Sequence, residues 1–308
     1  MEKRINRVIY RNITTEKKHI NKSLAIKDSA GLKVTKVIVF VLFMIYAITL
    51  IFPFIWMFYN SFKTNPEFWQ SVWSFPKNLG NGWKNFITAI TMKKSGSTII
   101  EMTLRSVFLT LAGTLLSLIS SSTISYVVSK YKFKGRNLIY IVAITIMIVP
   151  TIGATSATYK LINNLGLYNN YLGILLLYSG GFGFQFLLLY GVFKSISWSY
   201  AEAAMVDGAS DFKIFSTVML PMAMPTLVPL AIMDIISLWN DYFTPYMYLK
   251  GKPTLAVGLQ SMVSQMEYNA NWPALFMLMI ISMIPILIIF IVFQKQIMAN
   301  VTAGGLKG

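Results

Sequence analysis

Residues 202–209 read Glu-Ala-Ala-Met-Val-Asp-Gly-Ala, and Leu220-Pro221 follow a short way along the chain. This stretch separates two apolar segments, near 171–193 and 219–240, which are each long enough to cross a lipid bilayer. Alanine favours helix, and Asp207-Gly208 ends a helix because glycine readily adopts a positive φ. We therefore predict a short helix, a tight turn and a second helix between two membrane spans.

The ends of this helical hairpin also have sequence signals. Ser199 precedes Glu202 by three residues, the spacing of a capping box, so we expect the first helix to begin at about residue 200. Ser210 is placed to cap the second helix, which runs into the membrane. A helix of this length is not stable alone, so it must pack on other parts of a protein. By pattern alone, an ordinary hairpin in which Glu202 only caps a helix explains the stretch equally well.

The composition indicates a polytopic membrane protein. Of 308 residues, 55% are hydrophobic and 12% are charged. We expect an all-α fold with a basic segment at 1–35 and a transmembrane domain at 36–308. We expect no metal or catalytic site, because cysteine is absent and His19 is the single histidine. Six spans are predicted, near 36–58, 106–128, 137–156, 171–193, 219–240 and 274–295.

Charge distribution predicts the orientation. Six spans put both termini on one side, and a cytoplasmic amino terminus leaves 18 of the 27 Lys and Arg residues inside. The loop at about 194–218 is then cytoplasmic, as are both termini. The net charge of +16 is accordingly a consequence of topology. Attraction to anionic lipid headgroups explains the basic segment at 1–35 more simply than nucleic-acid binding does.

Polar residues within the predicted spans are candidates for a translocation pathway. Asp234, Ser237 and Asn240 lie on or near one helical face of the fifth span, and Gln185 lies in the fourth. A carboxylate in a bilayer is costly unless it faces protein or water. Asp234 therefore either meets a structural partner across a subunit interface or faces a cavity. The segment 180–183, with three glycines, is either a flexible break or a close helix crossing, and we favour the crossing.

The hairpin residues resemble a known family. Glu202-Ala203-Ala204 with Asp207-Gly208-Ala209, then Phe215 and Leu220-Pro221, closely resemble the EAA loop of binding-protein-dependent ABC importer permeases. Thr217 and Asp211 depart from that family's pattern, where a basic residue and a proline are frequent. The resemblance narrows to the carbohydrate importers, in particular to the type of the second maltose permease protein. The further matching stretches are 53–57, 60–63, 133–136, 239–241, 294–295 and 302–308.

The resemblance implies a type I ABC importer permease fold in a bacterial cell membrane. It implies a subunit that forms half of a translocation pathway for a sugar or oligosaccharide. The implied partners are a second homologous permease subunit, two ATPase subunits that dock at the hairpin and bind ATP and Mg, and an extracytoplasmic sugar-binding protein. We expect no enzymatic activity in this chain, because its single Gly-Lys pair, Gly251-Lys252, precedes Pro253 and forms no P-loop.

Other functions predict other features. A permease for a different small polar solute delivered by a binding protein would have the same hairpin. An ion-coupled secondary carrier would show paired repeats and broken helices with ion ligands near the midplane. A membrane enzyme would need clustered acid–base or metal groups. Neither of the last two classes explains the hairpin, and the sequence does not identify the sugar.

Overall fold

The computed structural model describes residues 30–94, 96–148, 153–269 and 271–304. Among these residues, four helical stretches are long and apolar enough to cross a membrane. They are α2 (Ala30–Asn60), α5 (Ile99–Lys130), the continuous stretch Asp211–Asn240, and the first part of α15 (Trp272–Gly304). In this part of the chain the strands are limited to β1 (Lys93–Lys94) and β2 (Ser97–Thr98), which pair antiparallel. The predicted all-α class is confirmed, and most of the basic segment at 1–35 lies outside the described residues.

The predicted count of six spans is not confirmed. The described part of the third predicted span is α6 (Arg136–Ile148), of 13 residues, and α7 (Ala154–Asn164) begins beyond residues 149–152, which are not described. The fourth is two helices, α8 (Tyr171–Tyr178) and α9 (Phe184–Ser195). Gly183, with φ of 105°, lies immediately before α9 and interrupts the helix.

The glycine segment that joins α8 and α9 is both a break and a close crossing. A Cβ atom on Gly181 would lie 2.6 Å from Cδ1 of Ile124 and 3.1 Å from the carbonyl carbon of Ser120. A side chain at this position would require Ile124 and the α5 backbone to shift. The crossing that we favoured from sequence is therefore present at Gly181, and the break lies two residues later at Gly183.

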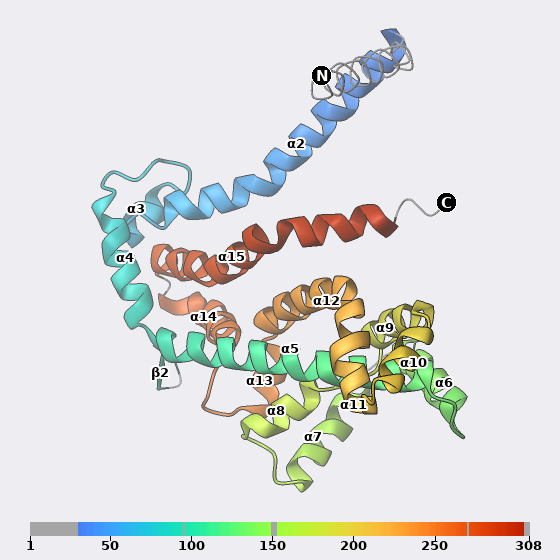
Figure 1. Cartoon of the computed structure of the whole chain (residues 1–308). Helices are drawn as coiled ribbons and strands as arrows, with labels where there is room; N and C mark the ends of the chain where they lie inside the picture. The colour runs from blue at the N-terminus through green and yellow to red at the C-terminus, as the bar shows by residue number, and fades with distance from the viewer. Residues whose placement is uncertain (1–29, 95, 149–152, 270, 305–308) are drawn as a thin grey trace, which may run out of the picture. The chain divides into compact units, whose positions relative to one another are not determined.

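The chain forms two units, residues 1–57 and 58–308. The described part of the first unit, residues 30–57, lies entirely in helix α2. In the second unit, α5 packs along α9 and along α12 (Leu220–Asn240), which Figure 1 shows beside it. Small residues on the inner face of α5, most of them polar, permit this close packing. They are Ser106, Thr110, Gly113, Thr114, Ser117, Ser121 and Ser125, which lie mostly three or four residues apart.

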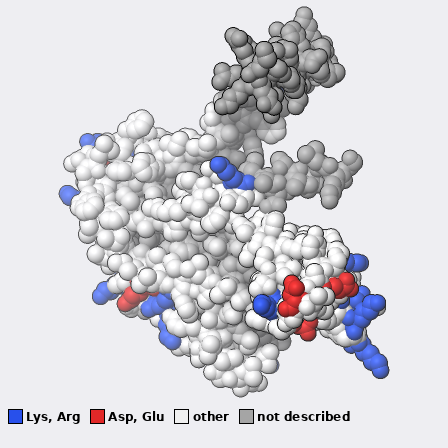
Figure 2. Space-filling model, in the orientation of Figure 1, with Lys and Arg blue, Asp and Glu red and all other residues white. Residues whose placement is uncertain are grey.

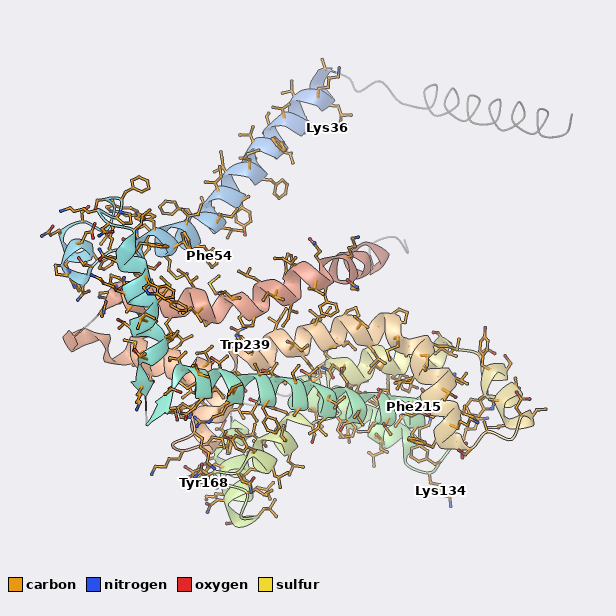
Figure 3. All side chains as sticks on the ribbon, turned by 60° about the vertical axis from the view of Figure 1, so that its left-hand side comes forward. Lys36, Phe54, Lys134, Tyr168, Phe215 and Trp239 are labelled. Atoms are coloured by element: carbon orange, nitrogen blue, oxygen red, sulfur yellow. The ribbon has the colours of Figure 1, made fainter. Side chains whose placement is uncertain are left out.

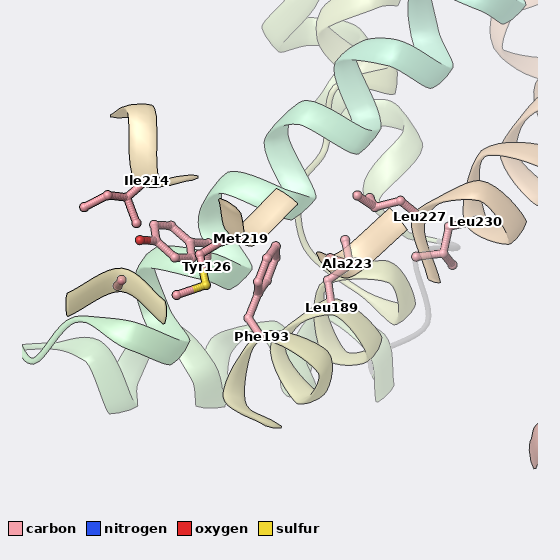
Figure 4. Packing of buried hydrophobic residues seen from close by; sticks show 9 residues of the cluster. Tyr126, Leu189, Phe193, Ile214, Met219, Ala223, Leu227 and Leu230 are labelled. Carbon is pink, nitrogen blue, oxygen red and sulfur yellow. The ribbon is translucent and has the colours of Figure 1, made fainter. Parts of the chain in front are cut away.

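Two buried clusters lie at opposite ends of α12. Phe215 and Trp239, labelled in Figure 3, mark the two ends. At the Phe215 end, side chains from α5, α9 and α12 pack with those of α10 (Ser199–Val206) and α11 (Asp211–Ile214) (Figure 4). At the Trp239 end, α4 (Gly80–Thr91), α14 (Leu255–Asn269) and α15 contribute, and the Trp239 indole Nε1 donates to the Ser282 carbonyl at 3.2 Å.

Shorter helices lie in the connections between α2 and α5 and between α12 and α15. After α2, α3 (Asn65–Gln70) begins with a complete capping box of Thr64 and Glu67, and α4 follows it along the chain. The Asn85 side-chain amide donates to the carbonyls of Ser61 and Lys63 at 2.7 and 2.8 Å. After α12, α13 (Phe243–Tyr248) precedes α14. The hydrogen bonds of Asn85 tie α4 to the chain that leaves α2.

Candidate functional site

The predicted helical hairpin is present at residues 199–219. It consists of α10, a turn at 207–210, and α11, which continues through a π-helical turn at Phe215–Met219 into α12. Ser210 caps α11 as predicted, since its Oγ accepts from the Lys213 amide at 3.4 Å. Helices α11 and α12 therefore form one continuous element.

The turn between the two helices has the predicted chemistry. Gly208 has φ of 77°, and its amide donates to the Met205 carbonyl at 2.9 Å. The Ala209 amide donates to the Ala204 carbonyl at 3.0 Å, which closes the end of α10. A Cβ atom on Gly208 would meet no other atom within 4 Å, so backbone conformation, and not space, requires glycine here.

The predicted capping box at the start of α10 is wrong. The helix already begins at Ser199, where the carbonyl of Trp198 accepts from the Ala201 and Glu202 amides at 2.8 and 3.1 Å. No side chain caps the helix, and the Ser199 hydroxyl pairs with that of Ser197 at 2.8 Å. The Trp198 ring, immediately before the helix, packs edge-on against Tyr131, 5.8 Å between centroids. Glu202 therefore does not serve as a cap.

The inner face of the hairpin is anchored to the ends of α5 and α9. Ala201, Ile214 and Met219 have no exposed surface, and Figure 4 shows Ile214 and Met219 beside Tyr126. The ring of Phe215 lies 4.9 Å from that of Tyr126. At the rim, the Lys130 ammonium group donates to the Ile196 carbonyl. This packing supplies the tertiary support that a short helix such as α10 requires.

The outer face of the hairpin combines charges with exposed apolar side chains. Glu202, Ala203 and Asp207 are exposed, Val206 is 88% exposed and Phe212 is 77% exposed. Figure 2 shows acidic and basic side chains gathered over this end of the molecule, beside largely uncharged surfaces. We call these five residues the hairpin surface. Exposed apolar groups rimmed by charge are typical of a protein contact site.

A second polar group lies between the spans. The Gln185 side-chain amide donates to Oδ1 of Asp234, and its Oε1 accepts from Ser117 and Ser121 at 3.1 and 3.2 Å. The Thr114 hydroxyl, one turn away on α5, and Oδ2 of Asp234 are both buried without a hydrogen-bond partner among the described residues. This polar group joins α5, α9 and α12.

The structure separates the four predicted pathway residues. It brings Gln185 and Asp234 together, whereas Ser237 and Asn240 are exposed, and the Asn240 amide donates to the Ile236 carbonyl of its own helix. One partner of Asp234, Gln185, therefore lies in this chain. Ser117 and Ser121 were missed by sequence reasoning. The three- and four-residue spacing of Ser and Thr along α5 is the signal that would have identified them.

Comparison with known proteins places the chain in a family. Residues 113–302, which contain the hairpin and the polar group, match the family of binding-protein-dependent transport system inner membrane components. The chain belongs to this family. It is therefore a permease subunit, a multi-pass protein of the inner membrane, and it resembles transport subunits and not enzymes.

Several relatives cover most of this permease. The diacetylchitobiose uptake system permease protein NgcG of Streptomyces coelicolor is 29% identical over 85% of this chain and 86% of its own length. The arabinooligosaccharides transport system permease protein AraQ of Bacillus subtilis is 28% identical over 92% of this chain and 100% of its own. A solved bacterial ABC transporter that imports the acidic polysaccharide alginate superposes with a TM-score of 0.78, 25% identity, and coverage of 88% and 99%.

Proposed function

We propose that this permease subunit forms half of the translocation pathway of an ATP-driven importer for a sugar or oligosaccharide. The observation that carries the proposal is the hairpin surface, an exposed, charge-rimmed patch on a helix pair that continues without interruption into α12. Relatives that take up diacetylchitobiose and arabinooligosaccharides support the sugar class. Another small polar solute delivered by a binding protein is the second candidate, because the same hairpin would serve it.

Coupling follows from the way the hairpin is anchored. When ATP binding closes the ATPase dimer, α10 moves with the ATPase to which it docks, and its buried Ala201 moves the Ile214 and Met219 side chains. The Gly208 turn and α11 carry this displacement into α12. ATP binding shifts the equilibrium of the permease because the closed ATPase dimer favours the outward-facing arrangement. Reversal of a strongly biased equilibrium requires a difference of about 5 kcal/mol between the two states.

The partners of the subunit follow from the same reasoning. A second homologous permease subunit completes the pathway, two ATPase subunits bind ATP and Mg, and an extracytoplasmic sugar-binding protein delivers the substrate. The family description, which names binding-protein-dependent transport, supports the last partner. The lack of a P-loop in the sequence supports a separate ATPase. ATPase docking at the hairpin, through Glu202–Ala204 and Asp207–Ala209, makes this loop and both termini cytoplasmic.

The polar group at Asp234 has two open roles. A pathway role for Asp234, Gln185, Ser237 and Asn240 stays a prediction. The hydrogen bonds between Gln185 and α5 favour a role in holding three spans together. The two roles differ in their effect on the apparent affinity for sugar.

The function is tested by reconstitution into lipid vesicles. The complete complex, with its binding protein and ATP inside the vesicles, is expected to take up sugar and to hydrolyse ATP faster when the loaded binding protein is present outside. The matched control contains the permease chain alone. Uptake by this chain alone, driven by an ion gradient, would overturn the proposal in favour of a secondary carrier.

A further inference from the structure

A pocket of about 400 Å³ lies between α13 and α14, beyond the end of α12 that is remote from the hairpin. Figure 1 shows these two helices near each other below α15. The volume falls within the range of about 300–1,000 Å³ typical of small-molecule sites. The lining residues that the structure describes are Tyr242, Tyr246, Val257, Gln260, Ser261 and Ser264.

The lining residues follow the helical period. Tyr242 and Tyr246 are four residues apart, so both lie on one side of the α13 turn, where they are 44% and 65% exposed. Gln260, Ser261 and Ser264 form one face of α14, at offsets of one and four residues. Two aromatic rings therefore face an amide and two hydroxyl groups across the pocket.

The opposite face of α14 is fixed to α5. The Leu255 amide donates a 2.9 Å hydrogen bond to the Ser106 hydroxyl, and a Cβ atom on Gly258 would lie 2.5 Å from Sδ of Met102. Met262, one turn further along, is buried. Contacts on one face therefore leave the other face, with Gln260 and Ser264, open to a ligand.

Hydrogen bonds also hold α13 in place. Oδ2 of Asp241 accepts from the Tyr178 hydroxyl at 2.9 Å, and its Oδ1 accepts from the Thr244 amide at 3.0 Å. Tyr248, at the end of α13, is buried. Both walls of the pocket are thus fixed before a ligand arrives, which reduces the entropy lost on binding.

The chemistry of the lining suits a neutral sugar. Tyrosine rings offer flat apolar faces for the C–H face of a pyranose or furanose ring. The Ser261 and Ser264 hydroxyls donate to the Gly258 and Gln260 carbonyls at 2.9 Å, so they accept from sugar hydroxyls, whereas the Gln260 amide can both donate and accept. Neither α13 nor α14 contains Lys or Arg. Of the two lysines between them, Lys252 donates to the Asn169 carbonyl at 3.2 Å and lies over the Tyr171 ring, and Lys250 interacts with Tyr159. Among the lining residues that the structure describes, a sugar carboxylate would lose hydration without gaining a cationic partner.

We infer that the pocket between α13 and α14 binds a neutral sugar unit, with Tyr242 and Tyr246 stacking on the ring and Gln260, Ser261 and Ser264 bonding its hydroxyls. The inference rests on the proposed function and specifies its substrate as uncharged. It distinguishes this chain from the solved transporter that imports an acidic polysaccharide. The site lies at the end of the subunit where a sugar released by the binding protein would enter.

The test uses the absence of cysteine from this chain. Ser261→Cys introduces a thiol in the pocket, and Val263→Cys is the control, because Val263 is exposed on the same helix and does not line the pocket. Both variants are assembled into the complete complex, with partner cysteines replaced. The probes are maltose, diacetylchitobiose and arabinobiose as neutral sugars, and a uronate trisaccharide as the acidic one. Stimulation of ATP hydrolysis identifies the transported sugar, which is then used for protection from a thiol reagent.

We expect the transported neutral sugar, at about ten times its Kd, to slow modification of the Ser261→Cys variant roughly tenfold, because only unoccupied pockets react. Modification of the Val263→Cys variant is expected to be unchanged. The inference would be overturned if the thiol at position 261 were modified at equal rates with and without sugar, or if it did not react with the reagent in the absence of sugar. Stimulation of ATP hydrolysis would still support the proposed function in both cases. Protection by the uronate alone would overturn the neutral class. If no probe stimulates ATP hydrolysis, the proposed function fails, and the inference fails with it.

A second measurement addresses the tyrosines. Tyr246→Ala is expected to raise the KM for sugar uptake several-fold and to leave the level of assembled complex unchanged. Phe243→Ala removes an exposed aromatic ring from the same helix outside the lining, and is expected to leave KM unchanged. An equal effect of the two substitutions would show that α13 has only a structural role.

Discussion

The Tyr131 hydroxyl donates a 2.9 Å hydrogen bond to Oδ1 of Asp211, which is 80 residues further along the chain. This bond joins the residue that follows α5 to the first residue of α11, at the rim of the hairpin. The Tyr131 ring also packs against Trp198, just before α10. One tyrosine thus contacts the beginnings of both helices of the hairpin and fixes their position relative to α5.

Tyr131→Phe removes this hydrogen bond and keeps the ring. We expect a loss of about 1 kcal/mol of stability, since the bond is partly exposed to solvent, and weaker co-purification of the ATPase. The measurement is the Tm of the assembled complex. Tyr140→Phe is the control, because it removes a hydroxyl from α6, outside the hairpin. If both substitutions lower Tm equally, the bond has no special role.

The same bond predicts a pH dependence. Burial, followed by the hydrogen bonds with Tyr126 and Asp211, raises the pKa of Tyr131 above its ordinary value of 10.0. Because the folded state favours the protonated phenol, its contribution to stability is complete below pH 10 and is lost as pH rises above that value. We expect the Tm difference between wild type and Tyr131→Phe to be constant from about pH 6 to 9. A difference that changes across that range would contradict this assignment.

Gly208→Val tests coupling through the turn. A β-branched residue at φ of 77° costs about 1–3 kcal/mol, which displaces α10 from α11. We expect sugar uptake to fall while the complex still assembles and hydrolyses ATP. Gly153→Val is the control, because Gly153 has φ of −83° and open space around its Cα. Wild-type uptake by the Gly208 variant, with normal assembly, would show that the turn does not transmit motion.

Ala203→Trp tests the hairpin surface as the ATPase contact. Ala203 is exposed on α10, and an indole there would hold the partner away from the close contact that a small residue allows. We expect binding of the ATPase subunits to weaken by at least about tenfold, equivalent to about 1.4 kcal/mol, as measured in a pull-down titration. Ala157→Trp, on an exposed part of α7, is the matched control. Unchanged binding in the Ala203 variant would place the ATPase elsewhere.

Asp234→Asn distinguishes the two roles of the polar group. The amide keeps an acceptor for Gln185, so a role in holding the spans together predicts a normal Tm and a normal KM for sugar. A pathway role predicts a changed KM. Gln185→Leu leaves Ser117 and Asp234 without their partner and is expected to cost about 1–3 kcal/mol in either case. A Gln185→Leu complex with wild-type Tm would show that the group is not a structural tie.

Local sequence rules determined the hairpin well. The alanines of 201–204, the Asp207-Gly208 stop and the Ser210 cap all concern neighbours within one helical turn, and each lies where predicted. The sequence also predicted the membrane-length helices α5, α12 and α15, because a span is identified by the length and hydrophobicity of its segment alone. The family was recognisable for the same reason, since its motif occupies one short loop.

The errors concern contacts between distant segments. Ser199 has the spacing of a cap, but it is the first residue of the helix, and Trp198, which precedes it, packs on Tyr131. The fourth apolar stretch is long enough to cross a membrane, but the close approach of Gly181 to α5 accompanies its division into α8 and α9. The glycines of 180–183 predicted the crossing at Gly181, whereas the packing of Trp198 on Tyr131 has no signal in the local pattern.

By itself, the sequence determined an all-α membrane protein with a protruding hairpin, because hydrophobic length and turn chemistry act over a few residues. Only the tertiary structure decided that Asp234 meets Gln185, 49 residues away, and that two tyrosines face Gln260 across a pocket. Such pairings depend on which helices cross and on the residues at which they cross. The packing of small residues along α5 determines these crossings, and the local sequence pattern does not predict which helices pack there.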